Sequence, residues 1–214
     1  MIVGCDELQE CLLPWWWKNY SAHNDYPVTF CDFGMSKRAL DYCQKRGDTI
    51  AVKSHVELKD GQWTHHFGCN IDSVRRAWIK KPFALQKASY RTNLWLDLDC
   101  EVRGDLDPLF NCLVFGDDVA LVSDIAGYNA GVILFKKGAG LIKEWCEVIE
   151  HNPNQHVGDQ GFLNEVAQAH SVTKLPYAFN YQRWMPPIND PLVIHHTEGA
   201  GKEEIVKQCI LSEA

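Results

Sequence analysis

Two aspartates at the end of an apolar run are the residues of this sequence best suited to bind a metal ion. The run Leu94-Trp95-Leu96-Asp97-Leu98-Asp99 predicts a buried strand, and side chains two positions apart on a strand share one face. Asp97 and Asp99 can therefore reach the same ion. Magnesium-type ions bind one or two carboxylates together with substrate phosphates, so the pair indicates a metal bound to a diphosphate.

A second Asp-x-Asp sequence shows that this spacing is weak evidence by itself. At this content of aspartate, roughly one such pair is expected by chance. Asp105-Leu106-Asp107 follows Gly104 and precedes Pro108, which is typical of a turn exposed to solvent. We therefore expect Asp105 and Asp107 on a solvated turn, and we take the first pair as the candidate metal site.

A cluster late in the sequence adds the groups that a metal and a diphosphate need. The apolar run from Leu192 to Ile194 predicts a strand, and His195, His196, two glycines and Lys202 follow it. A histidine ligand, a flexible backbone and a cation are suited to a diphosphate site. The alternative interpretation is a core histidine beside a surface lysine.

Other reactive residues have simpler explanations. His65, His66 and Cys69 resemble metal ligands, but a structural zinc site needs four ligands and the sequence offers no partner pair. Cys100 lacks an assigned histidine base, so we expect it to pack on the other face of the strand rather than act as a nucleophile. Glu101 is interpreted as a solvated or supporting carboxylate rather than a third ligand.

The elements that must position these residues alternate between strands and helices. We expect strands at 2–5, 28–33, 49–53, 92–98, 120–123, 131–135 and 192–195, and helices at 14–20, 36–45, 78–88, 139–150, 159–169 and 202–211. Ser36 is a typical helix N-cap. Residues 54–77 are expected to form a long irregular connection. The alternation predicts an α/β fold with a parallel sheet between helices.

Length and charge limit the classes of protein to consider. The 214 residues suit a single domain over 1–214. The net charge of −7 argues against nucleic acid as a partner, because its phosphates need a basic face. No apolar run approaches the roughly 20 residues of a transmembrane segment, and Asp6 and Glu7 come too early for a signal peptide. We therefore expect a cytoplasmic protein.

The cysteines and the tryptophan run have mainly structural interpretations. Nine cysteines without a C-x-x-C pair predict buried free thiols rather than a disulfide framework. Trp15, Trp16 and Trp17 point about 100° apart on a helix, so at least one is expected near the surface. Such a ring could contribute to a homo-oligomer or an acceptor surface.

The order of these motifs resembles that of the family 8 glycosyltransferases, a group that includes glycogenin and bacterial lipopolysaccharide galactosyltransferases. The matching pieces span nearly the whole chain: Val3-Gly4-Cys5-Asp6-Glu7, Lys81, Asp97-Leu98-Asp99, Tyr128-Asn129-Ala130-Gly131-Val132, Asp159-Gln160, and His-x-x-Gly-x-x-Lys at 196–202. The resemblance implies a GT-A fold, a Rossmann-like fold with a mixed, mostly parallel central sheet flanked by helices.

The resemblance also implies site residues. It makes Asp97, Asp99 and His196 the ligands of manganese or magnesium, with His196 preferred to His195 because only His196 has glycine three and lysine six residues later. It assigns donor binding to Asp6, Lys81, Asp97, Leu98, Asp99, Asp124, Gly199 and Lys202. It places Asn129, Asp159 and Gln160 around the transferred sugar. Within this set Asp6 would lie near the base and Lys202 on the diphosphate.

The resulting hypothesis is a metal-dependent glycosyltransferase. It would move a hexose from a nucleotide sugar, implied to be a UDP-sugar, to an unknown glycan, lipid or protein acceptor, with retention of anomeric configuration. The dipole of the predicted helix would keep Asp159 ionised and make it a weak base, which fits retention.

Three alternatives remain open. They are an inverting GT-A transferase, a sugar-phosphate nucleotidyltransferase, and a catalytically silent module that binds a nucleotide sugar. A nucleotidyltransferase normally carries a glycine-rich, basic loop near its N-terminus, and Gly4-Cys5-Asp6-Glu7 is not such a loop.

Overall fold

The structure is a computed structural model that describes residues 1–63, 71–113, 116–125, 127–196 and 205–207. Five residues named in the sequence analysis lie outside this part of the chain: His65, His66, Cys69, Gly199 and Lys202. Of the helix expected at 202–211, only residues 205–207 are described, and they are helical.

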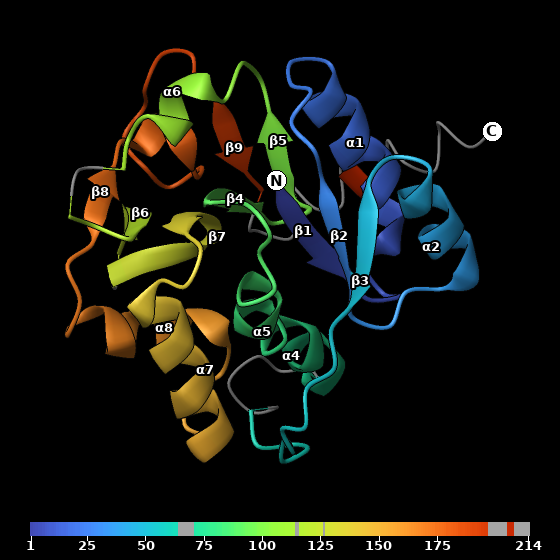
Figure 1. Ribbon diagram of the computed structural model, residues 1–214, viewed down its shortest axis with the longest axis vertical. Coiled ribbons are helices and arrows are strands. Elements are labelled where there is room, and N and C mark those ends of the chain that lie inside the picture. Colours follow the sequence, from blue (N-terminus) through green and yellow to red (C-terminus); the bar gives the residue numbers. More distant parts are fainter. Residues whose placement is uncertain (64–70, 114–115, 126, 197–204, 208–214) are drawn as a thin grey trace.

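A seven-stranded sheet runs through the molecule in the order β3-β2-β1-β4-β7-β6-β8 (Figure 1). Its strands are β1 (Ile2–Cys5), β2 (Thr29–Asp32), β3 (Asp48–Ala51), β4 (Thr92–Leu96), β6 (Val119–Asp124), β7 (Gly127–Lys136) and β8 (Thr173–Leu175). Strands β3, β2, β1 and β4 are parallel, and β8 is parallel to β6. Strand β7 runs antiparallel to its neighbours β4 and β6. The sheet is mixed and mostly parallel, which confirms the expected fold class.

Helices cover both faces of the sheet, and the sheet separates the hydrophobic core into two parts. On one face α1 (Leu13–Ser21) and α2 (Lys37–Gln44) pack with Leu94 and Leu96 of β4. On the other face lie α4 (Asp72–Trp78), α5 (Lys81–Leu85), α7 (Gly140–His151) and α8 (Asp159–Ala167), which gather below the sheet in Figure 1. Trp95 faces this second core, because successive side chains on a strand point to opposite faces. In the described part of the chain, no helix is both long and apolar enough to cross a membrane.

A separate two-stranded sheet joins the middle of the chain to its late part. Strand β5 (Cys100–Val102) pairs antiparallel with β9 (Val193–His195), with Cys100 opposite His195. The two strands lie side by side in Figure 1. Asp97-Leu98-Asp99 is the short connection from β4 to β5, so this pairing carries the late histidines to the two aspartates.

Several predicted elements differ from the observed ones. The connection at 54–77 includes α4, and the helix expected at 78–88 is instead the end of α4 followed by α5, with Pro82 in the first turn of α5. Strands β5 and β8 were not anticipated. The solvated turn expected at Asp105–Asp107 keeps its carboxylates exposed, but Asp107 begins a short helix, α6 (Asp107–Phe110).

Local expectations at the first helices are confirmed. The Ser36 side chain accepts a hydrogen bond from the Ala39 N–H at 3.2 Å, as an N-cap does. Trp16 is fully buried, whereas Trp15 and Trp17 are half-buried. The buried free thiols are Cys5, Cys31, Cys43, Cys100 and Cys146.

Candidate active site

Three side chains of types that can bind a metal meet where β4, β5 and β9 end or begin. Asp97 directly follows β4, Asp99 directly precedes β5, and His195 is the last residue of β9. The Nε2 of His195 lies 3.2 Å from Asp99 Oδ1 and 3.8 Å from Asp97 Oδ2. His195 and Asp99 are buried, while Asp97 is half-buried. Two carboxylates and an imidazole are a donor set that suits manganese or magnesium.

The expected ligand His196 lies elsewhere. Its backbone N–H donates to the Asp99 carbonyl at 3.0 Å, and its Nε2 lies 2.9 Å from Glu101 Oε2. The Trp15 ring packs edge-on against it, with centroids 5.9 Å apart. The structure therefore places His195, not His196, beside the two aspartates. The hydrogen bond from His196 holds the pKa of Glu101 below its ordinary value, which makes Glu101 a supporting carboxylate as expected.

Gly131 on β7 provides the surface on which the His195 ring rests. A Cβ at position 131 would overlap the ring at Cε1 and Nδ1. The Nδ1 atom is buried and has no hydrogen-bond partner among the described residues. The imidazole is thus fixed by close packing, with Nε2 directed at the carboxylates. This arrangement fits a metal ligand, although such histidines usually also donate through the second ring nitrogen.

Lys81 joins Asp97, which follows β4, to Asp159 at the start of α8. Its buried Nζ lies 2.9 Å from Asp97 Oδ1 and 2.6 Å from Asp159 Oδ2, and it donates to the Ala130 carbonyl at 3.1 Å. Burial alone would lower the pKa of the Lys81 ammonium, but the carboxylates of Asp159 and Asp97 outweigh it and raise that pKa. Lys81 is therefore charged at neutral pH, and it lies in the predicted donor region.

The pKa of Asp159 moves in the direction opposite to the one expected from the helix dipole. Asp159 begins α8, as predicted, but it is buried. Burial raises the pKa of its carboxyl, Lys81 opposes that shift, and the nearby Asp97 adds to it. The dipole of α8 favours the ionised form of Asp159, but desolvation of the buried carboxyl is the larger effect.

An amide network connects the residues assigned to the transferred sugar. The Asn129 side-chain amide donates to Asp124 Oδ2 at 3.2 Å and to Gln160 Oε1 at 3.1 Å. Gln160 Nε2 donates to Asp124 Oδ2 at 3.0 Å, and the Ala130 N–H donates to Gln160 Oε1 at 3.2 Å. The structure thus brings Asp124, Asn129 and Gln160 together beside Asp159, as the resemblance implied.

Two further asparagines belong to this network and were missed from the sequence. Asn180 is fully buried, and its amide donates to Asn129 Oδ1 at 2.8 Å. Asn164, one turn after Gln160 on α8, donates to the Gln160 and Tyr128 carbonyls at 2.9 Å. The i, i+4 spacing of Gln160 and Asn164 was a visible signal, whereas nothing in the sequence around Asn180 pointed to the site.

One cleft of about 570 Å³ is lined by Lys81, Asp97, Asp99, Asn129, Asp159, Gln160, Asn164 and His195. Its wall includes Trp63, Trp78 and the backbone segment 155–158, and its floor carries the aspartates, His195 and the amide network. The buried guanidinium of Arg75 holds that wall through hydrogen bonds to the Val157 carbonyl at 2.7 Å and the His156 carbonyl at 3.3 Å. The cleft opens at the carboxyl end of β4, where α/β sheets bind ligands.

Asp6 and Leu98 lie at the edge of this site. Asp6 follows β1, and its carboxylate accepts a hydrogen bond from the Leu8 N–H at 3.1 Å. Leu98 is buried in the core and borders a small cavity of about 40 Å³ that Gly4, Lys81 and Asp97 also line. Neither residue directs a polar side chain into the larger cleft.

Cys100 packs against Asp99 and His195 from the core side. Its thiol, an oxygen of Asp99 and a ring nitrogen of His195 lie within 4.8 Å of one another. Burial, together with Asp99 and Asp97, raises the pKa of the thiol well above its ordinary value. A raised pKa disfavours the thiolate, so the surroundings of Cys100 do not activate it as a nucleophile.

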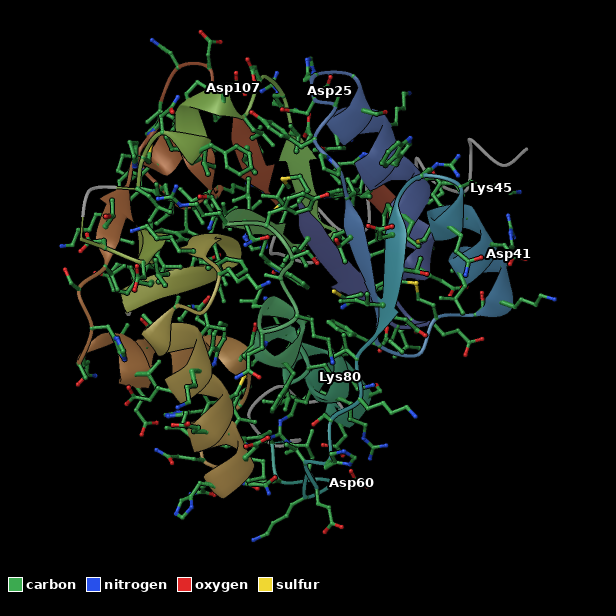
Figure 2. The ribbon with its side chains drawn as sticks, viewed as in Figure 1. Asp25, Asp41, Lys45, Asp60, Lys80 and Asp107 are labelled. Carbon is green, nitrogen blue, oxygen red and sulfur yellow. The ribbon has the colours of Figure 1, made fainter. Side chains whose placement is uncertain are left out.

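The second Asp-x-Asp pair is remote from this cleft. Neither Asp105 nor Asp107 lines the cleft; Asp107 is exposed, accepts a hydrogen bond from the Tyr26 hydroxyl, and lies at the top of Figure 2, whereas Lys80 lies in its lower half. The choice of Asp97 and Asp99 as the candidate pair therefore agrees with their position in the fold.

No protein-family model matches the chain, and no curated protein matches it in sequence. Solved structures do match in fold. The glycosyltransferase GlyE of Streptococcus pneumoniae TIGR4 is 17% identical with a TM-score of 0.65, and the match covers 99% of this chain but only 63% of GlyE. The chain thus spans less than two thirds of that structure.

Two other glycosyltransferases match over most of their own length. The galactosyltransferase LgtC, solved with donor and acceptor sugar analogs, is 17% identical with a TM-score of 0.66, over 98% of this chain and 95% of LgtC. Mouse xyloside xylosyltransferase 1 is 11% identical with a TM-score of 0.59, over 92% of this chain and 96% of that one. At these identities the likeness concerns the fold, and it confirms the GT-A fold implied by the sequence motifs.

Proposed function

We propose that this chain is a metal-dependent glycosyltransferase that moves a hexose from a UDP-sugar to a glycan, lipid or protein acceptor. The observation that carries the proposal is the convergence of Asp97, Asp99 and His195 in one cleft, beside the buried Lys81–Asp159 pair. The fold shared with LgtC, whose structure holds donor and acceptor sugar analogs, supports the choice of donor class.

In this proposal Asp97, Asp99 and His195 hold manganese or magnesium. When bound, the ion supplies Lewis-acid stabilisation to the diphosphate that leaves as the sugar–phosphate bond breaks. Lys81 fixes the positions of Asp97 and Asp159 through its two ion pairs. Lys202 and Gly199, which lie outside the described residues, are proposed to contact the diphosphate, and Asp6 to lie near the base.

The network around Gln160 favours retention of anomeric configuration. Gln160 Oε1 already accepts two hydrogen bonds, from Asn129 and Ala130, so its oxygen is held in place. Although burial raises the pKa of Asp159, its Oδ2 lies 2.6 Å from Lys81 Nζ, and a proton accepted there would break a buried ion pair. An inverting reaction needs such a base, whereas in a retaining reaction the departing diphosphate can accept the acceptor's proton on the same face.

The configuration of the first-formed product tests this proposal. A screen of nucleotide sugars with glycan, lipid and peptide acceptors identifies a productive pair, and proton NMR then follows the anomeric signal of the new linkage. An α-linked UDP-sugar should give an α-linked product. A β-linked product would contradict retention, and the absence of both transfer and donor hydrolysis across the screen would favour a catalytically silent binding module.

A further inference from the structure

The two carboxylate oxygens of Asp97 have different surroundings. Oδ1 accepts a hydrogen bond from the Trp95 indole N–H at 2.7 Å and lies 2.9 Å from Lys81 Nζ. Oδ2 lies 3.2 Å from the same Nζ and is the oxygen directed at the His195 ring, 3.8 Å from Nε2. Oδ1 therefore interacts with two donors and Oδ2 with Lys81 alone, and Oδ2 is the oxygen that faces the residues that would share an ion.

The indole is held firmly enough to act as a fixed donor. Trp95 and Asp97 are two positions apart at the end of β4, so their side chains lie on the same side of the strand. Only 1% of Trp95 is exposed, and its ring stacks on Phe33 with centroids 6.3 Å apart. The Lys81 ammonium lies 5.6 Å from the indole centroid, which adds a cation–π contact. The ring cannot turn without disturbing this packing.

We propose that Trp95 is a positioning residue that presents Asp97 to the ion through Oδ2 alone and so favours manganese or magnesium over calcium. Calcium accepts six to eight oxygens and often takes both oxygens of a carboxylate, whereas magnesium-type ions need a compact octahedral set. A carboxylate whose second oxygen is held by an indole contributes one ligand atom. This inference rests on the metal site proposed above.

Trp95→Phe tests the role of the N–H, because phenylalanine keeps an aromatic ring in the core but cannot donate. Manganese binding is measured on chelator-treated protein by the EPR signal of the free ion, and calcium binding by competition. We expect the manganese Kd to rise about 10-fold, as for other residues that orient a ligand. The calcium Kd should change much less, so the preference for manganese should fall.

Trp16→Phe is the matched control. Trp16 is equally buried, but its indole N–H has no partner among the described residues. Its substitution should lower the melting temperature through lost packing and leave the binding of both ions unchanged. If Trp16→Phe weakens manganese binding as much as Trp95→Phe does, the effect is general loosening of the core and the inference is overturned.

The remaining outcomes separate this inference from the proposed function. A wild-type protein that binds no manganese contradicts the metal site itself. A wild-type protein that binds manganese, with a Trp95→Phe variant of unchanged preference, overturns the role of Trp95 alone. If the Trp95→Phe variant does not fold, the wild-type protein provides the test. The Trp95 indole N–H should stay protected from hydrogen exchange when magnesium is added. Loss of that protection would show that the hydrogen bond to Asp97 does not persist in the metal-bound site, which would overturn the inference.

Discussion

At the scale of single residues, the chemistry of the site depends on which of two adjacent histidines faces the aspartates. Side chains alternate along a strand, so His195 and His196 point to opposite sides of the chain. His195 rests on Gly131 with its Nε2 toward Asp97 and Asp99, and His196 bonds to Glu101. Exchanging their roles would require a change in the pairing of β9 with β5.

Substitutions of the two histidines should therefore have different effects on manganese-dependent UDP binding. Asp99→Asn and His195→Ala should each weaken manganese-dependent UDP binding by more than about 100-fold, because each removes a ligand rather than a residue that orients one. His196→Ala and Asp107→Asn should leave the affinity unchanged. Isothermal titration calorimetry with UDP and manganese makes the comparison. Equal losses at Asp99 and Asp107, or at His195 and His196, would show that the site is placed wrongly.

Asp107 changes the pKa of Tyr26, which can be measured independently of ligand binding. The hydrogen bond to Asp107, more than partial burial, raises the pKa of Tyr26 to about 12. Since the folded state holds the proton more tightly, this pair stabilises the protein fully below the ordinary pKa of about 10 and loses that effect as the pH rises toward 12. In Asp107→Asn the Tyr26 pKa should fall toward its ordinary value when followed by NMR. The buried Tyr20 is the internal control, because burial rather than Asp107 raises its pKa.

At the scale of elements, β7 and β9 must approach closely for the site to form. The residue on β7 that faces the His195 ring is a glycine, and any side chain there would occupy the space of the imidazole. A close approach of this kind is a common reason for glycine inside a strand. The proposed metal site therefore depends on a residue whose side chain offers no ligand atom.

Gly131→Ala should displace His195 and lower manganese affinity, while destabilising the protein by roughly 1–3 kcal/mol through overpacking. Gly140→Ala provides the matched control, since a Cβ there would lie 3.5 Å from Cε1 of another histidine, His170, which is an ordinary contact. Chemical unfolding and EPR titration of manganese give the two readouts. Unchanged manganese binding in folded Gly131→Ala would contradict the role of the His195 ring.

The elements also show how much of the fold can be predicted from the sequence. Apolar runs located β1, β2, β4 and β9 to within a few residues, because buried strands are continuous hydrophobic stretches. Strands β5 and β8 are three residues long and carry no such signal, since tertiary pairing rather than composition makes them strands. The sequence also predicted His196 rather than His195 beside the aspartates. That prediction used the spacing to Gly199 and Lys202, and this spacing does not determine on which side of β9 a histidine ring lies.

At the scale of the whole molecule, β4 joins the two cores that pack on opposite faces of one sheet to the cleft. The strand contributes Leu94 and Leu96 to one core and Trp95 to the other, and Asp97, which lines the cleft, directly follows it. Filling the cleft with a ligand that bridges its walls should therefore stabilise the entire fold. The effect should be visible in global unfolding.

UDP with manganese should raise the melting temperature of the chain. A ligand at about 100 times its Kd adds roughly 2.7 kcal/mol, which corresponds to roughly 5–10 °C for a protein of this size. Differential scanning calorimetry measures the shift, and a chelator should abolish it. Equal stabilisation by UDP with and without manganese would mean that no ion bridges the diphosphate to Asp97, Asp99 and His195.

The pairing of β5 with β9 has a consequence for how the chain is made. Glu101 and His196, which bond across this pair, are 95 residues apart, and the closure of so large a loop must precede the assembly of the ligand set. During synthesis the two aspartates emerge from the ribosome long before His195, and domains form from the N-terminal side as the chain grows. A nascent chain that already contains β1 to β8 thus lacks the imidazole, and the proposed metal site can be completed only after β9 has been synthesised.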